Sequence, residues 1–115
     1  MGIDVEPLDS RIGPDTVAHV AAIDEREWLA GEPRSMTLIV FSAKESFYKA
    51  WFPLTGVWLD FRDVVVSLAG GTGTFAVSVP NVAEAHSPER WRHARGRFAV
   101  QSGRVHTAYV VRPVA

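Results

Sequence analysis

The sequence predicts an α+β protein in which two helices pack on an antiparallel sheet. After a short alternating segment, apolar residues recur at helical spacing as far as residue 52. Beyond that point they alternate with polar residues, in stretches rich in β-branched and aromatic side chains. Helices followed by a run of strands are typical of the α+β class. With 115 residues, the chain is expected to form a single domain over residues 1–115.

The first predicted element is a short strand at "GIDVE". Because successive side chains of a strand alternate, Ile3 and Val5 should share one face and Asp4 and Glu6 the other. Pro7 follows and is expected to stop the strand.

Two helices are predicted next. The first covers 14–31, "PDTVAHVAAIDEREWLAG", with Pro14 near its start and Gly31 at its end. The second runs from about residue 36 to residue 52, and Pro53 is expected to end it.

Four further strands are predicted at "LDFRDVVVSL", "TGTFAVSVP", "RGRFAVQSG" and "RVHTAYVVR". Glycine-rich or polar turns separate them. The last two should form a hairpin that turns at Ser102 and Gly103.

The second helix carries an ordinary core stripe and, on its other side, a charged pair among apolar residues. The stripe consists of Met36, Val40, Ala43, Phe47 and Ala50. Glu45 and Lys49 lie opposite, beside Leu38, Phe41, Tyr48 and Phe52. Because the domain has few elements to cover a helix twice, we expect something outside the chain to cover this side.

Composition excludes several classes of protein. The chain is 47% apolar and 22% charged, with a net charge of −1, so no global basic field attracts nucleic acid or anionic membranes. It contains no cysteine, which excludes disulfides and thiolate metal sites. A membrane-spanning run is absent from the sequence, and a cytoplasmic location is predicted.

Three acidic side chains are candidates for a metal site. Asp4 and Glu6 share a strand face, and Glu45 could join them to bind Mg²⁺, which prefers oxygen ligands and substrate phosphates. Lys44 and Lys49 flank Glu45 and could hold phosphate oxygens. Taken alone, each of these two segments has a simpler interpretation. Asp-x-Glu is typical of a solvated strand face. Glu45 and Lys49 are typical of an ion pair four residues apart on one helix, which contributes about 0.2–0.5 kcal/mol.

Taken together, "GIDVEP" and "FSAKESFYKAWFP" resemble motifs of the 4′-phosphopantetheinyl transferase superfamily, of its larger surfactin- and enterobactin-synthetase-activating type. The family's motifs are Gly-Ile-Asp-x-Glu and Trp/Phe-Ser/Thr/Cys-x-Lys-Glu-Ser/Ala-x-x-Lys. Every defined position matches: Gly2, Ile3, Asp4, Glu6, Phe41, Ser42, Lys44, Glu45, Ser46 and Lys49.

The resemblance implies transfer of the phosphopantetheine arm of coenzyme A to a serine of an acyl or peptidyl carrier protein. Asp4, Glu6 and Glu45 would then bind Mg²⁺ on the pyrophosphate. Glu45, or a water bound to it, would help to deprotonate the serine. Lys49 would stabilise charge on the transferred phosphate, and Lys44 would contact the pyrophosphate.

In the larger family type, the "GIDVE" motif opens the second of two similar halves, and coenzyme A lies between them. The chain therefore resembles a C-terminal half-domain whose first half is absent. We expect either that missing N-terminal half or a homo-oligomer, a dimer or trimer like the short holo-acyl-carrier-protein synthases, to complete the site. The alternative is a catalytically incomplete fragment or a non-catalytic module that binds carrier protein or nucleotide.

Overall fold

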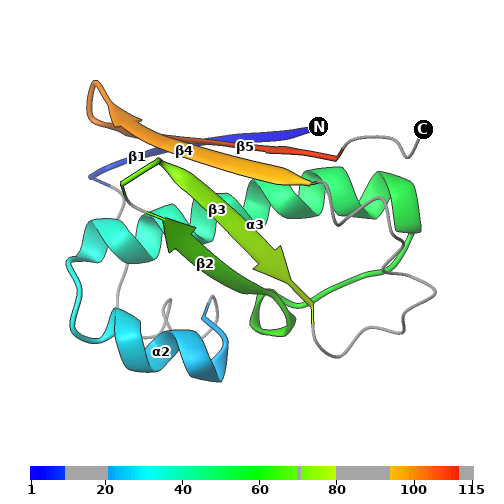
Figure 1. The fold of residues 1–115 in the computed structure, drawn as a ribbon, viewed down its shortest axis with the longest axis horizontal. Helices are drawn as coiled ribbons and strands as arrows, with labels where there is room; N and C mark the ends of the chain where they lie inside the picture. Colours follow the sequence, from blue (N-terminus) through cyan, green and yellow to red (C-terminus); the bar gives the residue numbers. More distant parts are fainter. Residues whose placement is uncertain (10–20, 70, 80–93, 112–115) are drawn as a thin grey trace.

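A five-stranded antiparallel sheet, in the order β1-β5-β4-β3-β2, forms one layer of the protein, and helices cover one of its faces (Figure 1). The computed structural model describes residues 1–9, 21–69, 71–79 and 94–111. The strands are β1 (Gly2–Pro7), β2 (Val65–Ala69), β3 (Thr74–Ser78), β4 (Arg95–Gln101) and β5 (Arg104–Val110). The predicted α+β class, with helices on an antiparallel sheet, is confirmed.

The predicted hairpin between the last two strands is confirmed. β4 and β5 pair along their whole length, from Arg95 opposite Val110 to Gln101 opposite Arg104. Ser102 and Gly103 have φ angles of 54° and 71°. Two consecutive positive φ values fit the twist of a tight two-residue hairpin. β1, from the other end of the chain, pairs with β5 and forms the edge of the sheet.

The strand predicted at "LDFRDVVVSL" begins later than expected. A short 3₁₀ helix, η1 (Phe61–Asp63), precedes β2. It forms because Asp60 accepts a hydrogen bond from the backbone N–H of Arg62, at 2.9 Å, and Asp63 accepts one from the N–H of Asp60, at 3.1 Å. These local side-chain bonds compete with strand formation.

The helices are α2 (Ile23–Leu29) and α3 (Arg34–Thr55). The first part of the predicted helix over 14–31 lies outside the described residues. No helix in the described part of the chain is long and apolar enough to cross a membrane.

The prediction that Pro53 ends the second helix is wrong, because α3 continues through it to Thr55. A proline in the last turn removes only one backbone hydrogen bond. The end is instead fixed by Gly56, which has a left-handed φ of 67° and donates its N–H to the carbonyl of Phe52 at 2.8 Å.

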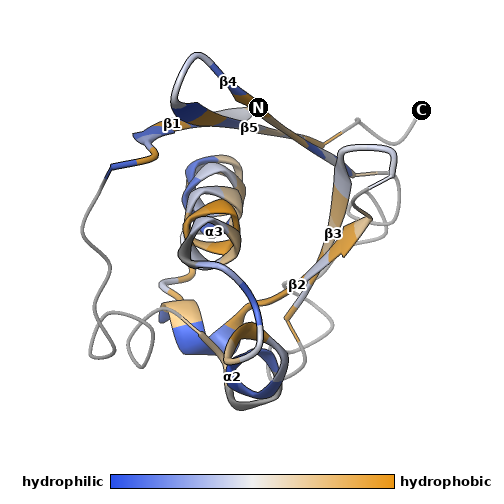
Figure 2. Cartoon of the chain, turned by 90° about the vertical axis from the view of Figure 1, so that its left-hand side faces the viewer, coloured by the Kyte–Doolittle hydropathy of each residue, from blue (hydrophilic) through white to orange (hydrophobic). Residues whose placement is uncertain are grey.

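The sheet curves around α3, which Figure 2 shows end-on inside the curve. Most of the predicted core stripe is buried, at 3% exposure or less, and Met36 is half-buried beside it. Leu38 was expected on the uncovered side, but it is buried against Ile39 and Val105. The curvature therefore covers more of the helix than its apolar pattern suggested.

Candidate active site

A close contact between β1 and α3 creates the site. A Cβ atom on Gly2 would lie 1.7 Å from the backbone oxygen of Ser46, so only glycine permits the strand to lie directly on the helix. The contact continues along β1 and brings Asp4 and Glu6 to the helix face that carries Glu45 and Lys49.

The two faces of β1 are reversed relative to an ordinary edge strand. Asp4 is buried, with 8% of its surface exposed, whereas Ile3 and Val5 are 57% and 46% exposed. The alternation predicted for this strand is therefore confirmed, and its acidic face points inward. Buried carboxylates require partners, because leaving them unpaired carries a large desolvation penalty.

Asp4 has partners on both carboxylate oxygens. Ser42 donates its hydroxyl to Oδ2 at 2.8 Å, and Lys49 donates its ammonium to Oδ1 at 3.1 Å. Lys49 also donates to the backbone oxygen of Ile3 at 3.1 Å. Its side chain is 51% exposed, so the ammonium group can leave Asp4 without crossing the core.

The three predicted metal-binding carboxylates interact with one another. Burial raises the pKa of Glu6 most, and repulsion from Asp4, a hydrogen bond that protonated Glu6 donates to Asp4, and repulsion from Glu45 raise it further. The pKa of Glu45 is likewise raised by burial and then by Asp4, and Lys49 partly offsets the shift. The folded chain thus holds three acidic groups together with one nearby ammonium group, and negative charge there is incompletely balanced.

These residues fit a divalent cation in chemistry and in charge. Hard carboxylate oxygens are the ligands that Mg²⁺ prefers, and a second cation would relieve the repulsion between them. Within the described ranges, however, no three His, Cys, Asp or Glu side chains already converge as a metal site. Side-chain rotation, with displacement of Lys49 from Asp4, would have to complete the coordination.

Lys44 contacts a different part of the molecule from the acidic cluster. Its side chain is fully buried, forms an ion pair with Glu25 of α2, and donates to the backbone oxygen of Phe61 at 2.8 Å. Burial lowers the pKa of Lys44, and the nearby carboxylates of Glu25 and Asp60 oppose the shift. Its side chain has no exposed surface in this structure, and the pyrophosphate contact expected of Lys44 stays a prediction.

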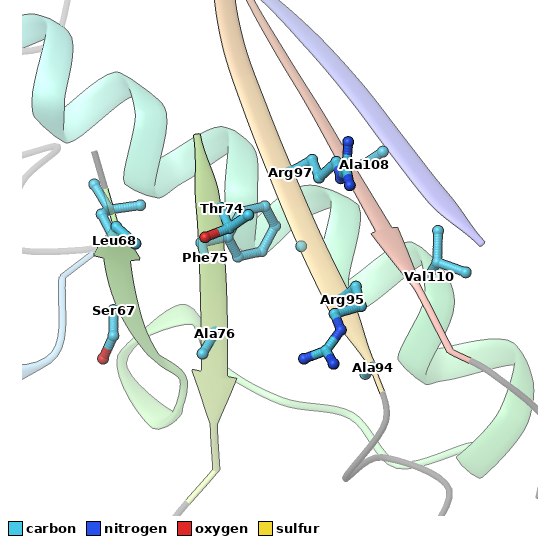
Figure 3. Close-up of a pocket in the computed structure, with 12 residues that line it drawn as sticks. Ser67, Leu68, Thr74, Phe75, Ala76, Ala94, Arg95, Arg97, Ala108 and Val110 are labelled. Atoms are coloured by element: carbon cyan, nitrogen blue, oxygen red, sulfur yellow. The ribbon is translucent and has the colours of Figure 1, made fainter. Parts of the chain in front are cut away.

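A cavity of about 390 Å³ opens beside Glu45. Its other lining residues come from α3 and from the segment that leads into η1: Tyr48, Trp58, Leu59, Asp60 and Phe61. A larger cavity, of about 640 Å³, lies on the sheet between β3 and β4 (Figure 3). Arg95 and Arg97 line it, and it contains none of the predicted site residues.

The family model described as "4'-phosphopantetheinyl transferase superfamily" matches residues 1–110, which include the whole acidic cluster. The chain belongs to the 4′-phosphopantetheinyl transferase superfamily. The resemblance carried by the two sequence motifs is thereby confirmed.

Curated members of the superfamily are similar over nearly all of this chain. The 4′-phosphopantetheinyl transferase Svp of Streptomyces mobaraensis is 36% identical over 116 residues, which cover 96% of this chain and 47% of that protein. The 4′-phosphopantetheinyl transferase PptT of Mycobacterium tuberculosis is 36% identical over 121 residues, covering 96% of this chain and 52% of that protein. The chain therefore spans about half the length of these superfamily members.

Solved structures show the same fold. The holo-[acyl-carrier-protein] synthase of Thermotoga maritima matches with a TM-score of 0.67 at 19% identity, over 96% of this chain and 61% of that one. The holo-ACP-synthase of Plasmodium yoelii matches with a TM-score of 0.69 at 14% identity, over 96% and 91%. At these identities, the likeness extends to the superfamily fold alone.

Sequence reasoning missed two groups of the site. Glu25, the partner of Lys44, lies in the first predicted helix, and Thr107, which contacts Ser42, lies in the last strand. A buried lysine almost always has an acidic partner, so a search for one could have suggested Glu25. The sequence contains no comparable signal for Thr107.

Proposed function

We propose that this chain catalyses transfer of the 4′-phosphopantetheine arm from coenzyme A to a serine of an acyl or peptidyl carrier protein, with Mg²⁺ as cofactor. The serine oxygen forms a bond to the phosphorus that carries the arm, and the pyrophosphate P–O bond breaks. Adenosine 3′,5′-bisphosphate leaves, and the serine proton passes to a base. The observation that best supports this proposal is the cluster of Asp4, Glu6, Glu45 and Lys49, at the positions of two superfamily motifs.

In this proposal Asp4, Glu6 and Glu45 hold Mg²⁺, which supplies charge neutralisation at the pyrophosphate. Lys49 contacts Asp4, and its exposed side chain can turn to the transferred phosphate. Glu45, directly or through a water, accepts the serine proton.

The cavity beside Glu45 is our proposed place for the part of coenzyme A that adjoins the pyrophosphate. That part is a flexible arm with amide and methyl groups. A volume of about 390 Å³ walled by Tyr48, Trp58 and Phe61 suits such an arm, because aromatic walls with few polar groups are typical of small-molecule sites.

We further propose that a partner completes the site, either a second copy of the chain or the additional sequence that the longer relatives possess. Phe52, Leu54 and Trp58, close to this cavity in sequence, are 45%, 50% and 71% exposed. Exposed apolar residues that gather in one region are typical of interaction surfaces. If a second copy completes the site, light scattering should detect an oligomer, and a monomer with full transfer activity would contradict this part of the proposal.

A transfer assay tests the function. The chain is incubated with coenzyme A, Mg²⁺ and an apo carrier protein, and the mass increase of the carrier protein is measured. We expect modification that requires Mg²⁺ and that Glu45→Gln lowers by at least about a hundredfold. Carrier protein that binds without being modified, even when a partner half is supplied, would favour the non-catalytic module instead.

A further inference from the structure

We propose that Thr107, acting through Ser42, is a positioning residue that fixes the carboxylate of Asp4 for cation binding. This inference rests on the proposed function. Neither hydroxyl touches substrate or cation in the proposal. Their role is to hold one oxygen of Asp4 from the buried side, so that the other oxygen faces the open side of the cluster.

The sheet register brings Thr107 to Asp4. The two residues are direct cross-strand partners in the antiparallel pair of β1 and β5. Opposite residues of such a pair point to the same face of the sheet, which here is the face that packs on α3. Ser42 projects from α3 into the same space, and its exposed fraction is 0%, against 3% for Thr107.

The three side chains form a closed set of hydrogen bonds. Ser42 Oγ donates to Asp4 Oδ2 at 2.8 Å, and Ser42 Oγ and Thr107 Oγ1 lie 2.9 Å apart. Thr107 Oγ1 also donates to the backbone oxygen of Ser42 at 2.9 Å. Because Ser42 has a single hydroxyl proton and directs it to Asp4, Thr107 can meet its Oγ only as a donor, sharing one proton between the two oxygens of Ser42.

Ser46, one turn further along α3, shows what such a serine does without partners on the sheet. It is also fully buried, but its hydroxyl donates to the carbonyl oxygen of Ala43 within the same helix, at 3.0 Å. This back-bonding is common for helical serines. Ser42 therefore differs from Ser46 because Asp4 and Thr107 provide bonding partners outside the helix.

The two oxygens of the Asp4 carboxylate have different partners. Oδ2 is anchored in the buried network, and Oδ1 faces the half-exposed ammonium of Lys49, which a cation could displace. A carboxylate fixed in advance loses less conformational freedom when it binds a cation, and hydrogen bonds of this kind are stronger in a buried environment. Removing either hydroxyl should therefore weaken cation binding.

The test compares four variants of the full chain: Thr107→Val, Ser42→Ala, Thr107→Ser and Ser46→Ala. Thr107→Val keeps the branched shape and removes the hydroxyl, whereas Thr107→Ser keeps the hydroxyl. Ser46→Ala removes a buried helical hydroxyl that does not contact Asp4, which makes it the matched control. Binding of Mn²⁺ alone is measured by electron paramagnetic resonance, and the transfer assay gives kcat and the KM for Mg²⁺.

We expect Ser42→Ala to weaken Mn²⁺ binding about tenfold and Thr107→Val about threefold to tenfold, because outer hydrogen bonds to metal ligands have effects of this order. The KM for Mg²⁺ should rise by similar factors, while kcat at saturating Mg²⁺ stays near the wild-type value. Thr107→Ser and Ser46→Ala should bind Mn²⁺ as the wild type does. Should Thr107→Val fail to fold, Ser42→Ala tests the same hydrogen-bond chain from its other end.

Two results would overturn the inference. Wild-type Mn²⁺ affinity in both Thr107→Val and Ser42→Ala would show that the hydroxyls do not position Asp4. An equal loss in Ser46→Ala would indicate a general packing effect. If wild-type protein binds Mn²⁺ and the variants are unaffected, only the positioning role fails. If wild-type protein neither binds Mn²⁺ nor transfers the arm, the proposed function fails with it.

Discussion

Lys44 and Glu45 are neighbours on α3, yet they belong to two polar clusters with opposite properties. Lys44 is fully buried, and Glu25, Phe61 and two backbone N–H groups complete its cluster. Glu45 belongs to the acidic cluster with Asp4 and Glu6, which is partly open, and its pKa is raised because burial and like charge are incompletely compensated.

The two clusters differ in whether their charges are paired within the folded chain. Glu25 accepts hydrogen bonds from the N–H groups of Ala22 and Val66, at 2.9 and 2.7 Å, in addition to its ion pair with Lys44. That cluster links α2, α3 and β2 through bonds among its own members. The acidic cluster has excess negative charge beside an accessible cavity, so its energy improves when a cation arrives.

The largest expected loss of stability comes from breaking the cluster around Lys44 and Glu25. Lys44→Met leaves Glu25 buried without its charge partner, and unfolding in urea should show a loss of about 3–5 kcal/mol in the free energy of unfolding. Adding Glu25→Gln should recover part of it, because the neutral amide oxygen can still accept a backbone N–H. A stable Lys44→Met protein that lacks transfer activity would instead support the original prediction of a phosphate contact.

Breaking the acidic cluster of Asp4, Glu6 and Glu45 should instead lower activity and leave stability nearly unchanged. Asp4→Asn removes one negative charge and weakens the proposed cation site, so transfer activity should fall about a hundredfold. The melting temperature of the metal-free protein should stay close to the wild-type value, since the asparagine relieves repulsion with Glu6 as it loses the ion pair with Lys49. A large drop in melting temperature without loss of specific activity would reverse the two assignments.

Gly2→Ala tests the contact between β1 and α3 that brings the acidic cluster together. The new Cβ atom would collide with the backbone of Ser46, which cannot move without distorting α3, so β1 must shift away. We expect a loss of about 1–3 kcal/mol in the free energy of unfolding, together with weaker Mn²⁺ binding. Gly103→Ala, at the exposed hairpin turn, is a control. Its positive φ strains an alanine and should lower stability, but Mn²⁺ binding should stay unchanged.

The smallest effect concerns pH. The pKa values of Glu6 and Glu45 in the folded chain lie above the 4.5 expected when unfolded. Their contribution to stability is therefore fully present below pH 4.5 and is lost as the pH rises through the raised pKa values. Mg²⁺ should consequently raise the melting temperature more at pH 7 than at pH 5.

A variant with both Glu6→Gln and Glu45→Gln isolates this contribution, since neither amide titrates. Its response to Mg²⁺ should be small and independent of pH. An unchanged, pH-dependent response in the double variant would place the cation elsewhere.

Much of the fold could be predicted because local patterns determine it. The alternation in β1, the core stripe of α3 and the hairpin at Ser102 and Gly103 are all visible in short windows of sequence. The error at Pro53 came from a nearby glycine whose signal was overlooked, whereas the error at Leu38 arose where long-range structure decides. Gly56 fixes the end of α3 beyond the proline, and the curvature of the sheet buries Leu38.

The proximity of the three carboxylates was also predictable. Two motifs were sufficient to bring Asp4 and Glu6 together with Glu45, and the structure holds them within electrostatic range. The buried ion pair of Lys44 with Glu25 could not be predicted, because the motif does not indicate which side of α3 carries Lys44 or that Glu25 lies there. Thr107 becomes a partner only through the pairing of β1 with β5, which joins opposite ends of the chain.

Paramagnetic broadening by Mn²⁺ is the most direct test of cation binding at the junction of β1 and α3. Nuclear magnetic resonance spectra of the isotopically labelled chain are recorded as Mn²⁺ is added. The account predicts that amide signals of residues 2–6 and 45–49 broaden first, and that Asp4→Asn removes the effect. Signals that broaden first around another part of the chain, or none that broaden while the protein stays folded, would contradict it.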